Sequence, residues 1–530
     1  MMRIAAEHLG DRWELATIPK EEPAVYDMLC RADSIGVFQV ESRAQIGTLP
    51  RLQPRTFYDL AIEIALIRPG PIQGGAVHPY VRRATGREPV TYPHPELVPV
   101  LERTLGVPLF QEQLMDMAKT IGDCTPDEAD LLRRAMGSKR GIERIESIKH
   151  KLYAGMERRG IVGDDADAIY VKILSFANFG FAESHALSFA KLVYASSWFK
   201  LHYPGAFLAG LLRAQPMGFY SAQSLVGDAR RHGVTVLKPD LERSGAQADL
   251  EPLTPDARTS GLDSCLLDHP GKTFFVQGTP DPTPQHRRDT AYAVRLGLDS
   301  VRGIGPEVAA RIVAARAERP FTDQVDLSRR AGLDARQLEA LATAGVFDSS
   351  GLTRRQALWN AGWTEREDQL EGVRVSGDAP MLPDMDAVET TMADLWATGV
   401  TTDSHPFGHL REQLRRAGVR SVADLAATEP NRRISVAGLV THRQRPGTAG
   451  GVTFLNLEDE TGMLNVICTV GGWRRHRKAA AGSSAVVIRG MLEREDGVTN
   501  LVADKISSLE DLHPEAGRAL KEKHRSRDFR

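Results

Sequence analysis

The chain has 530 residues, of which 42% are hydrophobic and 26% charged, and its 67 lysines and arginines nearly balance its 69 acidic residues. This length predicts about three to five domains, and the composition excludes a disordered, collagenous or membrane-spanning protein. The four cysteines are widely spaced and the first residues lack the apolar core of a signal peptide, so we expect no disulfide scaffold or zinc site and a cytoplasmic location.

The first part of the chain, residues 1–240, predicts a helical block. Residues 37–43, VFQVESR, form a short apolar run followed by polar groups. Taken alone, this pattern fits a buried turn with a structural ion pair. A nearly continuous apolar helix is expected over residues 60–67, and the prolines and glycine after Arg68 end it in a stiff loop. That loop either presents Arg68 to a ligand or is a plain helix terminator.

A basic segment at residues 131–153 contains seven lysines and arginines against two acids. Thr125 is suited to cap the preceding helix, with a proline in the first position and acids in the first turn. The helix carries Arg133 and Arg134 near its end, and Lys139 follows a glycine turn. Guanidinium groups bind phosphate oxygens in a bidentate manner, which favours a phosphate-binding role. The alternative for such a run is a solvated basic helix face.

A long helix is expected to open at Ser184 and to end at His202, with Lys191 and Lys200 exposed along it. Ser184 and His185 are adjacent, as nucleophile and base could be. No third partner and no nucleophile elbow accompany them, however. The sequence therefore favours a hydrogen-bonding or phosphate-facing role for His185 over catalysis.

Five segments of this helical block carry a resemblance to a known family. In order, they are VFQVESR, ALIRPGPIQGG, GVPLFQEQLM, LRRAMGSK and FANFGFAESHALSFA. Their order and spacing closely resemble the fingers region of the C-family bacterial DNA polymerases, the alpha subunits of DNA polymerase III. Residues 213–234 look more like the error-prone, damage-inducible members than the main replicative subunit.

The resemblance implies template-directed nucleotidyl transfer in translesion synthesis and damage-induced mutagenesis. The incoming dNTP would be held by Arg133, Arg134 and Lys139, with Arg68 near the nascent base pair. It also implies primer–template DNA as a partner, Mg²⁺ as the cofactor of the complete polymerase, and a sliding clamp reached through an adaptor protein of the mutagenesis machinery.

Residues 291–360 predict a tandem helix-hairpin-helix domain. Gly303 and Gly305 form a tight turn between two expected helices, where backbone N–H groups and the start of the next helix would approach a phosphate. Arg302 and Arg311 would add positive charge. A second helical unit follows, and an ordinary packing role is the alternative for that copy.

From residue 433 onward, five short alternating segments with turn signals predict a small closed barrel. Their order resembles the oligonucleotide-binding fold of the same family, which holds single strands with basic and aromatic side chains. Aromatic residues are few here, so a protein-docking barrel stays open as the alternative. The candidate DNA-binding residues are Arg443, Arg445, Trp473, Arg474, Arg475 and Arg477.

The predicted fold class is multidomain, mainly α over the N-terminal two-thirds, with fingers plus a tandem helix-hairpin-helix, and a C-terminal five-stranded OB-fold barrel. The expected domains are the fingers region at 1–240, a linker with short strands at 241–290, the helix-hairpin-helix domain at 291–360, a linker and helix at 361–430, the barrel at 431–512 and a basic tail at 513–530.

Polymerases transfer nucleotides through metal ions held by carboxylates, and in this family those aspartates belong to the palm, upstream of the fingers. Asp384 and Asp386 have an Asp-x-Asp spacing but lie in a predicted linker. We therefore expect a fingers-to-C-terminus fragment, or a product of split coding, that holds no metal site and is inactive alone.

Two alternatives belong to other functional classes. One is a non-catalytic DNA-binding or scaffold protein derived from such a polymerase. The other is a repair nuclease or helicase accessory, which the missing carboxylate cluster and the missing GxxxxGK[ST] loop disfavour.

Overall fold

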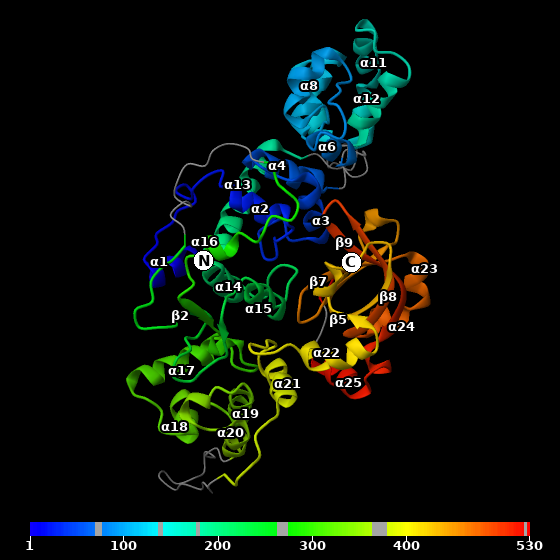
Figure 1. The fold of residues 1–530 in the computed structure, drawn as a ribbon. Helices are drawn as coiled ribbons and strands as arrows, with labels where there is room; N and C mark the ends of the chain where they lie inside the picture. Colours follow the sequence, from blue (N-terminus) through cyan, green and yellow to red (C-terminus); the bar gives the residue numbers. More distant parts are fainter. Residues whose placement is uncertain are drawn as a thin grey trace.

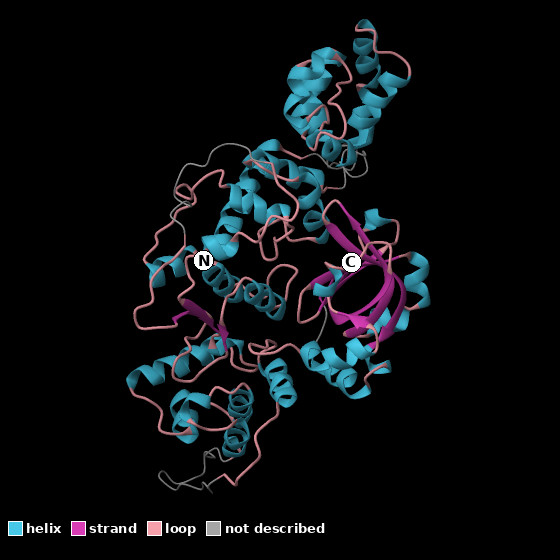
Figure 2. Cartoon of the chain, viewed as in Figure 1, coloured by secondary structure: helices cyan, strands magenta, loops and turns pink. Residues whose placement is uncertain are grey.

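The computed structural model describes residues 1–68, 77–135, 141–175, 181–261, 274–362, 379–523 and 527–529. Helices fill the N-terminal part and the middle of the chain, and a strand-rich barrel follows near the C-terminus (Figures 1 and 2). This arrangement confirms the predicted fold class. In the part of the chain that the structure describes, no helix combines the length and the apolar character that crossing a membrane requires.

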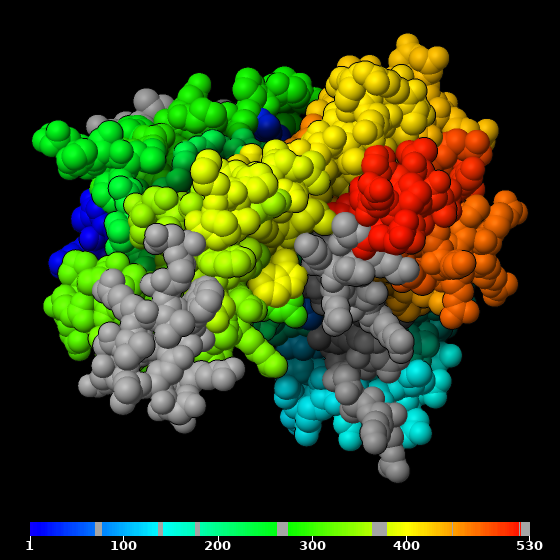
Figure 3. All heavy atoms as spheres, turned by 90° about the horizontal axis from the view of Figure 1, so that it is seen from below, coloured from blue at the N-terminus to red at the C-terminus, as the bar shows by residue number. Residues whose placement is uncertain are grey.

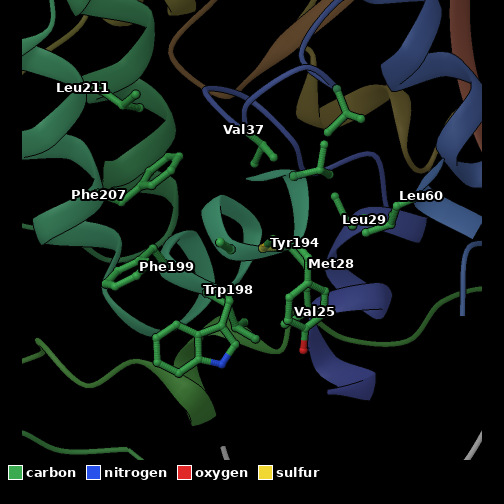
Figure 4. Close-up of a cluster of buried hydrophobic side chains, with 14 of the residues drawn as sticks. Val25, Met28, Leu29, Val37, Leu60, Tyr194, Trp198, Phe199, Phe207 and Leu211 are labelled. Carbon is green, nitrogen blue, oxygen red and sulfur yellow. The ribbon is translucent and has the colours of Figure 1, made fainter. Parts of the chain in front are cut away.

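A central helical block is organised around α13 (Glu183–His202), which packs against α2, α4 and α14. Every residue of α13 from Val193 to His202 is buried, because neighbours cover this half of the helix on all sides. Figure 4 shows Trp198 and Phe199 of α13 within the shared apolar core. The other helices of the block are α1 (Met2–Leu9), α2 (Pro23–Cys30), α3 (Arg43–Leu52), α4 (Phe57–Leu66), α14 (Pro204–Arg213) and α15 (Ala222–Arg231).

A helical lobe projects from this block at the top of Figure 1 and has a hydrophobic core of its own. Its helices α8 and α11 approach closely because both carry glycine at the crossing. A Cβ atom on Gly155 would lie 2.4 Å from the backbone carbon of Gly122. The helices of the lobe are α6 (Val77–Ala84), α7 (Val98–Leu101), α8 (Gln111–Gly122), α9 (Pro126–Ala135), α10 (Gly141–Ser147), α11 (Lys149–Arg158) and α12 (Asp164–Ser175), with 3₁₀ turns η1 (Pro95–Leu97) and η2 (Glu102–Thr104).

A small three-stranded sheet connects the central block to the middle domain. Its strands are β1 (Val236–Leu237), β2 (Asp249–Pro252) and β3 (Tyr292–Arg295), in the order β1-β3-β2. The central strand β3 runs parallel to β1 and antiparallel to β2. Helix α16 (Thr283–His286) lies before β3 in the chain.

The middle domain packs its helices around one core. A 3₁₀ turn η4 (Leu298–Ser300) precedes the Gly303–Gly305 turn, so the first expected helix is reduced to three residues. Four helices follow, and they are α17 (Pro306–Glu318), α18 (Gln324–Ala331), α19 (Ala335–Thr343) and α20 (Arg354–Ala361), with η5 (Asp348–Ser350) before the last.

The C-terminal barrel closes in the order β5-β6-β7-β9-β8 and back to β5. Only the β7–β9 pairing within this ring is parallel. Its strands are β5 (Arg433–Gln444), β6 (Thr453–Glu458), β7 (Met463–Cys468), β8 (Ala485–Glu495) and β9 (Val498–Ser508). Two short strands, β4 (Val419–Arg420) and β10 (Arg527–Phe529), add to β5 in parallel.

Helices α21 (Ala387–Ala397) and α22 (Pro406–Arg416) lie between the middle domain and the barrel. Figure 3 shows these helices in yellow between green and red parts of the chain, and α21 contacts α19, α22 and α25. The remaining short elements are α23 (Val470–Arg475), α24 (Arg477–Gly482), α25 (Pro514–Lys523), η6 (Ala423–Leu425), η7 (Gly447–Ala449) and η8 (Leu509–Asp511).

Candidate nucleotide and DNA interface

Helix α9 begins as the sequence predicts. Thr125 and Glu128 cap it reciprocally, since the Glu128 amide donates to Thr125 Oγ1 at 3.3 Å and the Thr125 amide donates to Glu128 Oε2 at 2.7 Å. This cap fixes the register of the helix. It sets Arg133 and Arg134 in the last turn.

Arg133 and Arg134 lie at the surface of the lobe, with side chains 48% and 58% exposed. Both contact the same carboxylate, because Nε of Arg133 lies 2.8 Å from Oδ1 of Asp130 and Nε of Arg134 lies 2.9 Å from Oδ2. The hydrogen bond from Arg133 lowers the pKa of Asp130 despite a smaller opposing effect of desolvation. Two guanidinium groups against one carboxylate leave a net positive charge that can hold an anion.

Lys139 lies outside the described residues, as does the glycine turn before it. The next helix is tied to α9 nonetheless. Arg144 of α10 donates from Nη1 to the carbonyl oxygen of Arg134 at 3.1 Å. The carbonyl end of α9 therefore faces a cation from the neighbouring helix, which complements the helix dipole.

Arg68 lies at the junction between the lobe and the central block. Its guanidinium carbon is 3.6 Å from the centroid of the Phe181 ring, and its buried Nε has no hydrogen-bond partner among the described residues. Burial lowers the pKa of Arg68. The loop that follows, residues 69–76, lies outside the described residues, so contact of Arg68 with a ligand stays a prediction.

Polar contacts join the lobe to the block beside Arg68. Tyr58 Oη donates to Glu183 Oε1 at 2.8 Å, and the Glu183 amide donates to Glu112 Oε2 at 3.0 Å. Arg103 pairs with the same Glu183 carboxylate at 3.0 Å and stacks over the Tyr58 ring. Sequence reasoning missed this junction because its members are separated by long stretches of chain and form no local pattern.

The prediction that Lys200 is exposed is wrong. Its side chain is 2% exposed, and Nζ lies 2.8 Å from Asp33 Oδ1 and 2.7 Å from Asp228 Oδ2. His232 completes the network, with Nε2 at 2.5 Å from Asp33 Oδ2. Burial alone would lower the pKa of His232, but the carboxylates of Asp33 and Asp228 raise it to about 9. Helical spacing favoured exposure, whereas the packing around α13 leaves this face no access to solvent.

Among the described residues, one group of three side chains could hold a metal ion, and it consists of Asp33, His232 and Asp281. Their potential ligand atoms all lie within 4.8 Å of one another. Asp33 already accepts hydrogen bonds from His232 and Lys200. A divalent cation there would be repelled by the Lys200 ammonium, and Mg²⁺ prefers oxygen ligands with several waters. These residues therefore fit an ion-pair network and not a pair of catalytic magnesium ions.

The Asp-x-Asp pair of the linker also has a structural role. Asp386 caps α21, because Oδ1 of Asp386 accepts a hydrogen bond from the amide of Glu389 at 2.8 Å. Asp384 is exposed in the irregular segment before it. Neither carboxylate lies on a strand, as a polymerase palm would need.

The first glycine turn of the middle domain is open. Gly303 has a φ of +78°, and a Cβ atom on either Gly303 or Gly305 would meet nothing within 4 Å. Arg302 is exposed beside the turn, with its guanidinium 4.9 Å from the centroid of the Trp396 ring. Arg311 instead donates from Nε to the carbonyl oxygen of Ala331 at 3.0 Å, which holds α17 against the end of α18.

The second unit is a full hairpin of α18 and α19, and Gly332 in the left-handed region ends α18. Gln337 of α19 donates from Nε2 to the carbonyl oxygen of Gly303 at 3.3 Å. The side chain of Arg354 fills the space beside Gly345. The second unit therefore supports the turn at Gly303. The later turn at Gly345 is filled by the side chain of Arg354.

The arginines predicted on the barrel fall into two groups. Arg443 is buried and donates to the carbonyl oxygens of Ala480 and Ser483, each at 2.6 Å, so it anchors α24 to the barrel. Trp473 packs against the barrel core. The exposed members of the predicted set are Arg445, Arg474, Arg475 and Arg477.

A basic hollow of about 320 Å³ lies beside β4, β5 and β8. Asp504 pairs with two of its arginines, Arg433 at 2.6 Å and Arg489 at 2.8 Å. Sequence reasoning missed this hollow because β5 and β8 bring its residues together from distant positions. Its four arginines are Arg420, Arg432, Arg433 and Arg489.

Three family models match the chain in sequence order. Residues 1–160 match the bacterial DNA polymerase III alpha subunit finger domain, residues 233–357 match a helix-hairpin-helix motif, and residues 434–509 match an OB-fold nucleic acid binding domain. These ranges include Arg133 and Arg134, the open glycine turn and the closed barrel, respectively. The matches support DNA as a partner of this chain.

The chain is also similar to proteins named error-prone DNA polymerase. It is 58% identical to the one from Cutibacterium acnes, over 99% of this chain and 46% of that protein. It is 52% identical to the one from Nocardia farcinica, over 100% of this chain and 43% of that protein. It is 51% identical to the one from Mycobacterium tuberculosis, over 99% of this chain and 44% of that protein. The chain thus spans less than half the length of these relatives.

Proposed function

The chain shares the fingers-to-C-terminus organisation of the error-prone C-family DNA polymerases, and from this premise we propose that it holds primer–template DNA and the incoming dNTP for template-directed nucleotidyl transfer. The setting would be translesion synthesis and damage-induced mutagenesis in the cytoplasm. The observation that carries the proposal is the exposed arginine pair on the capped helix α9, within the range that matches a polymerase finger domain.

In this proposal Arg133 and Arg134 bind the triphosphate, and Lys139 adds a third cation. Guanidinium groups match phosphate oxygens and remain charged, so they also stabilise negative charge that develops as the pyrophosphate leaves. Arg68, stacked on Phe181 at the junction, would contact the nascent base pair. Closure of the lobe over the DNA would then bring the arginine pair and Arg68 to the same substrate.

The DNA would be gripped without regard to sequence. The open turn at Gly303 and Gly305 offers backbone N–H groups and the start of α17 to a phosphate. Arg302 would add charge there. Arg445, Arg474 and Arg475 of the barrel would contact a strand from their exposed positions. Arg311 and Arg443 would contribute through the structure they hold.

The chemical step needs Mg²⁺ held by carboxylates, and we propose that a palm outside this chain supplies those carboxylates. This chain's own residues would bind, orient and neutralise the triphosphate. Accordingly, the polypeptide alone would bind primer–template DNA without extending it. Contact with a sliding clamp through an adaptor protein stays a prediction.

The test measures binding of a fluorescent dATP analogue and of primer–template DNA to the purified chain. Arg133→Ala combined with Arg134→Ala should weaken dATP binding by about tenfold or more, because charged hydrogen bonds contribute about 1.5–3 kcal/mol each. Arg158→Ala is the matched control, since Arg158 is 58% exposed on the same lobe and pairs with Asp123. It should change dATP binding by less than about twofold.

Two outcomes would contradict the proposal. One is metal-dependent primer extension by this chain that the double variant leaves unchanged. The other is dATP binding that falls equally in the double variant and in Arg158→Ala. DNA binding without any dATP binding would favour the alternative, a non-catalytic DNA-binding scaffold.

A further inference from the structure

Helix α21 packs on the middle domain although it follows that domain at a distance in the sequence. It begins at Ala387, after the range 233–357 that matches a helix-hairpin-helix motif. Figure 1 shows α21 beside α19, and the two helices are in contact. Ala397 at the end of α21 is 1% exposed and belongs to the core that α17, α18, α19 and α20 share. In space, α21 is therefore part of the middle domain.

A buried ion pair attaches this helix. Nη1 of Arg354 in α20 lies 2.7 Å from Oδ1 of Asp394 in α21, and the two side chains are 7% and 8% exposed. The same Nη1 donates to the carbonyl oxygen of Thr343 at the end of α19 at 3.1 Å. Breaking such a buried pair is strongly destabilising, so α21 has a fixed place on the domain.

The end of α21 also contacts the open glycine turn. The amide of Arg302, the residue before Gly303, donates to the carbonyl oxygen of Ala397 at 2.7 Å. The guanidinium carbon of Arg302 lies 4.9 Å from the centroid of the Trp396 ring. This distance is within the range of about 6 Å over which the face of an indole ring attracts a cation. Helix α21 thus holds both the backbone and the side chain of Arg302.

The contact with the ring leaves the guanidinium available to a ligand. Arg302 is exposed and Trp396 is 36% exposed. Stacking uses the face of the planar guanidinium, so the N–H donors at its edge can still bind a phosphate. The attachment of α21 does not need this contact, because the backbone hydrogen bond to Ala397 and the pair of Arg354 with Asp394 already supply it.

The surroundings of Arg302 suit an anion. Gly303 has a φ of +78°, and Gly305 is the N-cap of α17, so the positive end of this helix lies at the turn. Glu307 is the acid in the first turn of α17, and the charge of Arg302 offsets it. A free arginine side chain loses rotamer freedom when it binds a ligand. Contact with Trp396 removes part of that loss before a phosphate arrives.

We propose that Trp396 is a positioning residue for DNA, because its ring holds the Arg302 guanidinium where it and the backbone N–H groups of the glycine turn bind the same strand of a duplex. The DNA-binding surface of the middle domain then includes the end of α21. This inference rests on the proposed function, which names DNA as the ligand of the glycine turn.

The experiment measures binding of a fluorescent DNA duplex to the full chain, by anisotropy at several salt concentrations. Arg302→Ala should weaken binding by about 5- to 20-fold and reduce the salt dependence of log affinity by about 0.9, since one phosphate contact is lost. Trp396→Ala should weaken binding by about 3- to 10-fold, because the arginine remains but must be ordered on binding. Trp396→Phe should recover most of the affinity, because a phenyl ring also attracts a cation.

Coupling between the two residues separates positioning from a purely structural role. In a chain that already carries Arg302→Ala, Trp396→Ala should change the affinity by less than about twofold, because the ring then has no guanidinium to hold. A folding defect would instead weaken binding in both backgrounds and would lower the Tm. Trp359→Ala is the matched control, since Trp359 is 44% exposed on α20 of the same domain. It should leave duplex binding unchanged.

A second measurement does not depend on the folding of any variant. Phenylglyoxal modifies exposed arginines, and mass spectrometry of the wild-type chain follows the modification of each one. The duplex should slow the modification of Arg302. It should leave the modification of Arg3 unchanged, since Arg3 is 74% exposed on α1, in the central block.

Three results would overturn the inference and leave the proposed function standing. They are duplex binding that Arg302→Ala weakens and Trp396→Ala does not, equal losses from Trp396→Ala with and without Arg302, and modification of Arg302 that the duplex does not slow. A chain that binds no duplex would overturn the proposed function and this inference with it. The two kinds of failure are therefore distinguishable.

Discussion

The central block and the projecting lobe differ in the exposure of their paired cations, as Lys200 of the block and Arg133 and Arg134 of the lobe show. In the block, Lys200 is 2% exposed between two carboxylates, and His202 and Glu22, both 0% exposed, are paired at 2.8 Å. In the lobe, Arg133 and Arg134 are about half exposed around one carboxylate. Buried pairs are strongly destabilising to break, whereas exposed pairs contribute little to stability and stay available to a ligand.

The exposure of the side chain, and not the residue type, distinguishes structural cations from cations that can bind a ligand. Lys200 and Arg133 are both cations on helices, yet only Arg133 can reach a phosphate from its observed position. Substitution of Lys200 should therefore act on folding, and substitution of Arg133 or Arg134 should act on ligand affinity.

The largest effect is expected for Lys200→Met. Removal of the ammonium leaves Asp33 and Asp228 with less compensation in a buried site, which should cost about 3–5 kcal/mol of the free energy of unfolding. Denaturant unfolding of the purified chain measures it. Lys191→Met, at an exposed position of the same helix, is the control. Equal stability of the two variants would show that the buried network does not support the block.

Gly155→Ala tests whether the lobe is a separate folding unit. The added methyl group would lie 2.4 Å from the Gly122 backbone, so α8 and α11 must separate, at a cost of about 1–3 kcal/mol. Hydrogen exchange should become faster in α8 and α11 and stay unchanged in α13. Gly408→Ala in α22 is the control, because an added methyl group there meets nothing within 4 Å. It should slow hydrogen exchange or leave the exchange rates unchanged. Equal acceleration in α13 would contradict a separate lobe.

The block should lose stability as the pH rises. The folded-state pKa of His232, about 9, exceeds its usual value of about 6.5, so the folded chain binds more protons. This contribution is complete below about pH 6.5 and is lost as the pH passes through about 9, and a shift of this size corresponds to about 3 kcal/mol. Thermal unfolding at several pH values measures it. His232→Gln should flatten the profile over this window, and an unchanged slope would refute the assignment.

The smallest effect is expected for Asp130→Asn in the lobe. Loss of this carboxylate removes the anion that competes for Arg133 and Arg134. Binding of the dATP analogue should tighten by about two- to threefold, with no resolvable shift in Tm. Asp116→Asn, which removes an exposed carboxylate paired with Lys119 in the same lobe, is the control. Weaker binding by Asp130→Asn would show that this carboxylate orients the arginines instead of competing for them.

Local patterns predicted much of this molecule. The cap of α9, the open turn at Gly303 and the strands of the barrel each depend on neighbours within a few residues. The burial of Lys200 could not be predicted, because Asp33 lies 167 positions away in the sequence and reaches it only in the fold. The role of Arg443 was missed because its acceptors belong to α24 and the chain after it.

The buried hydrogen bond that Ser224 of α15 donates to Glu458 of β6 at 2.8 Å has a consequence for how such chains are recombined. Glu458 is 2% exposed, and burial raises its pKa, so a foreign α15 without a donor at position 224 would leave its carboxyl group without this partner. A barrel grafted from a relative should therefore bring its own α15. Successful chimeras should have crossover points that keep α15 and β6 from one parent.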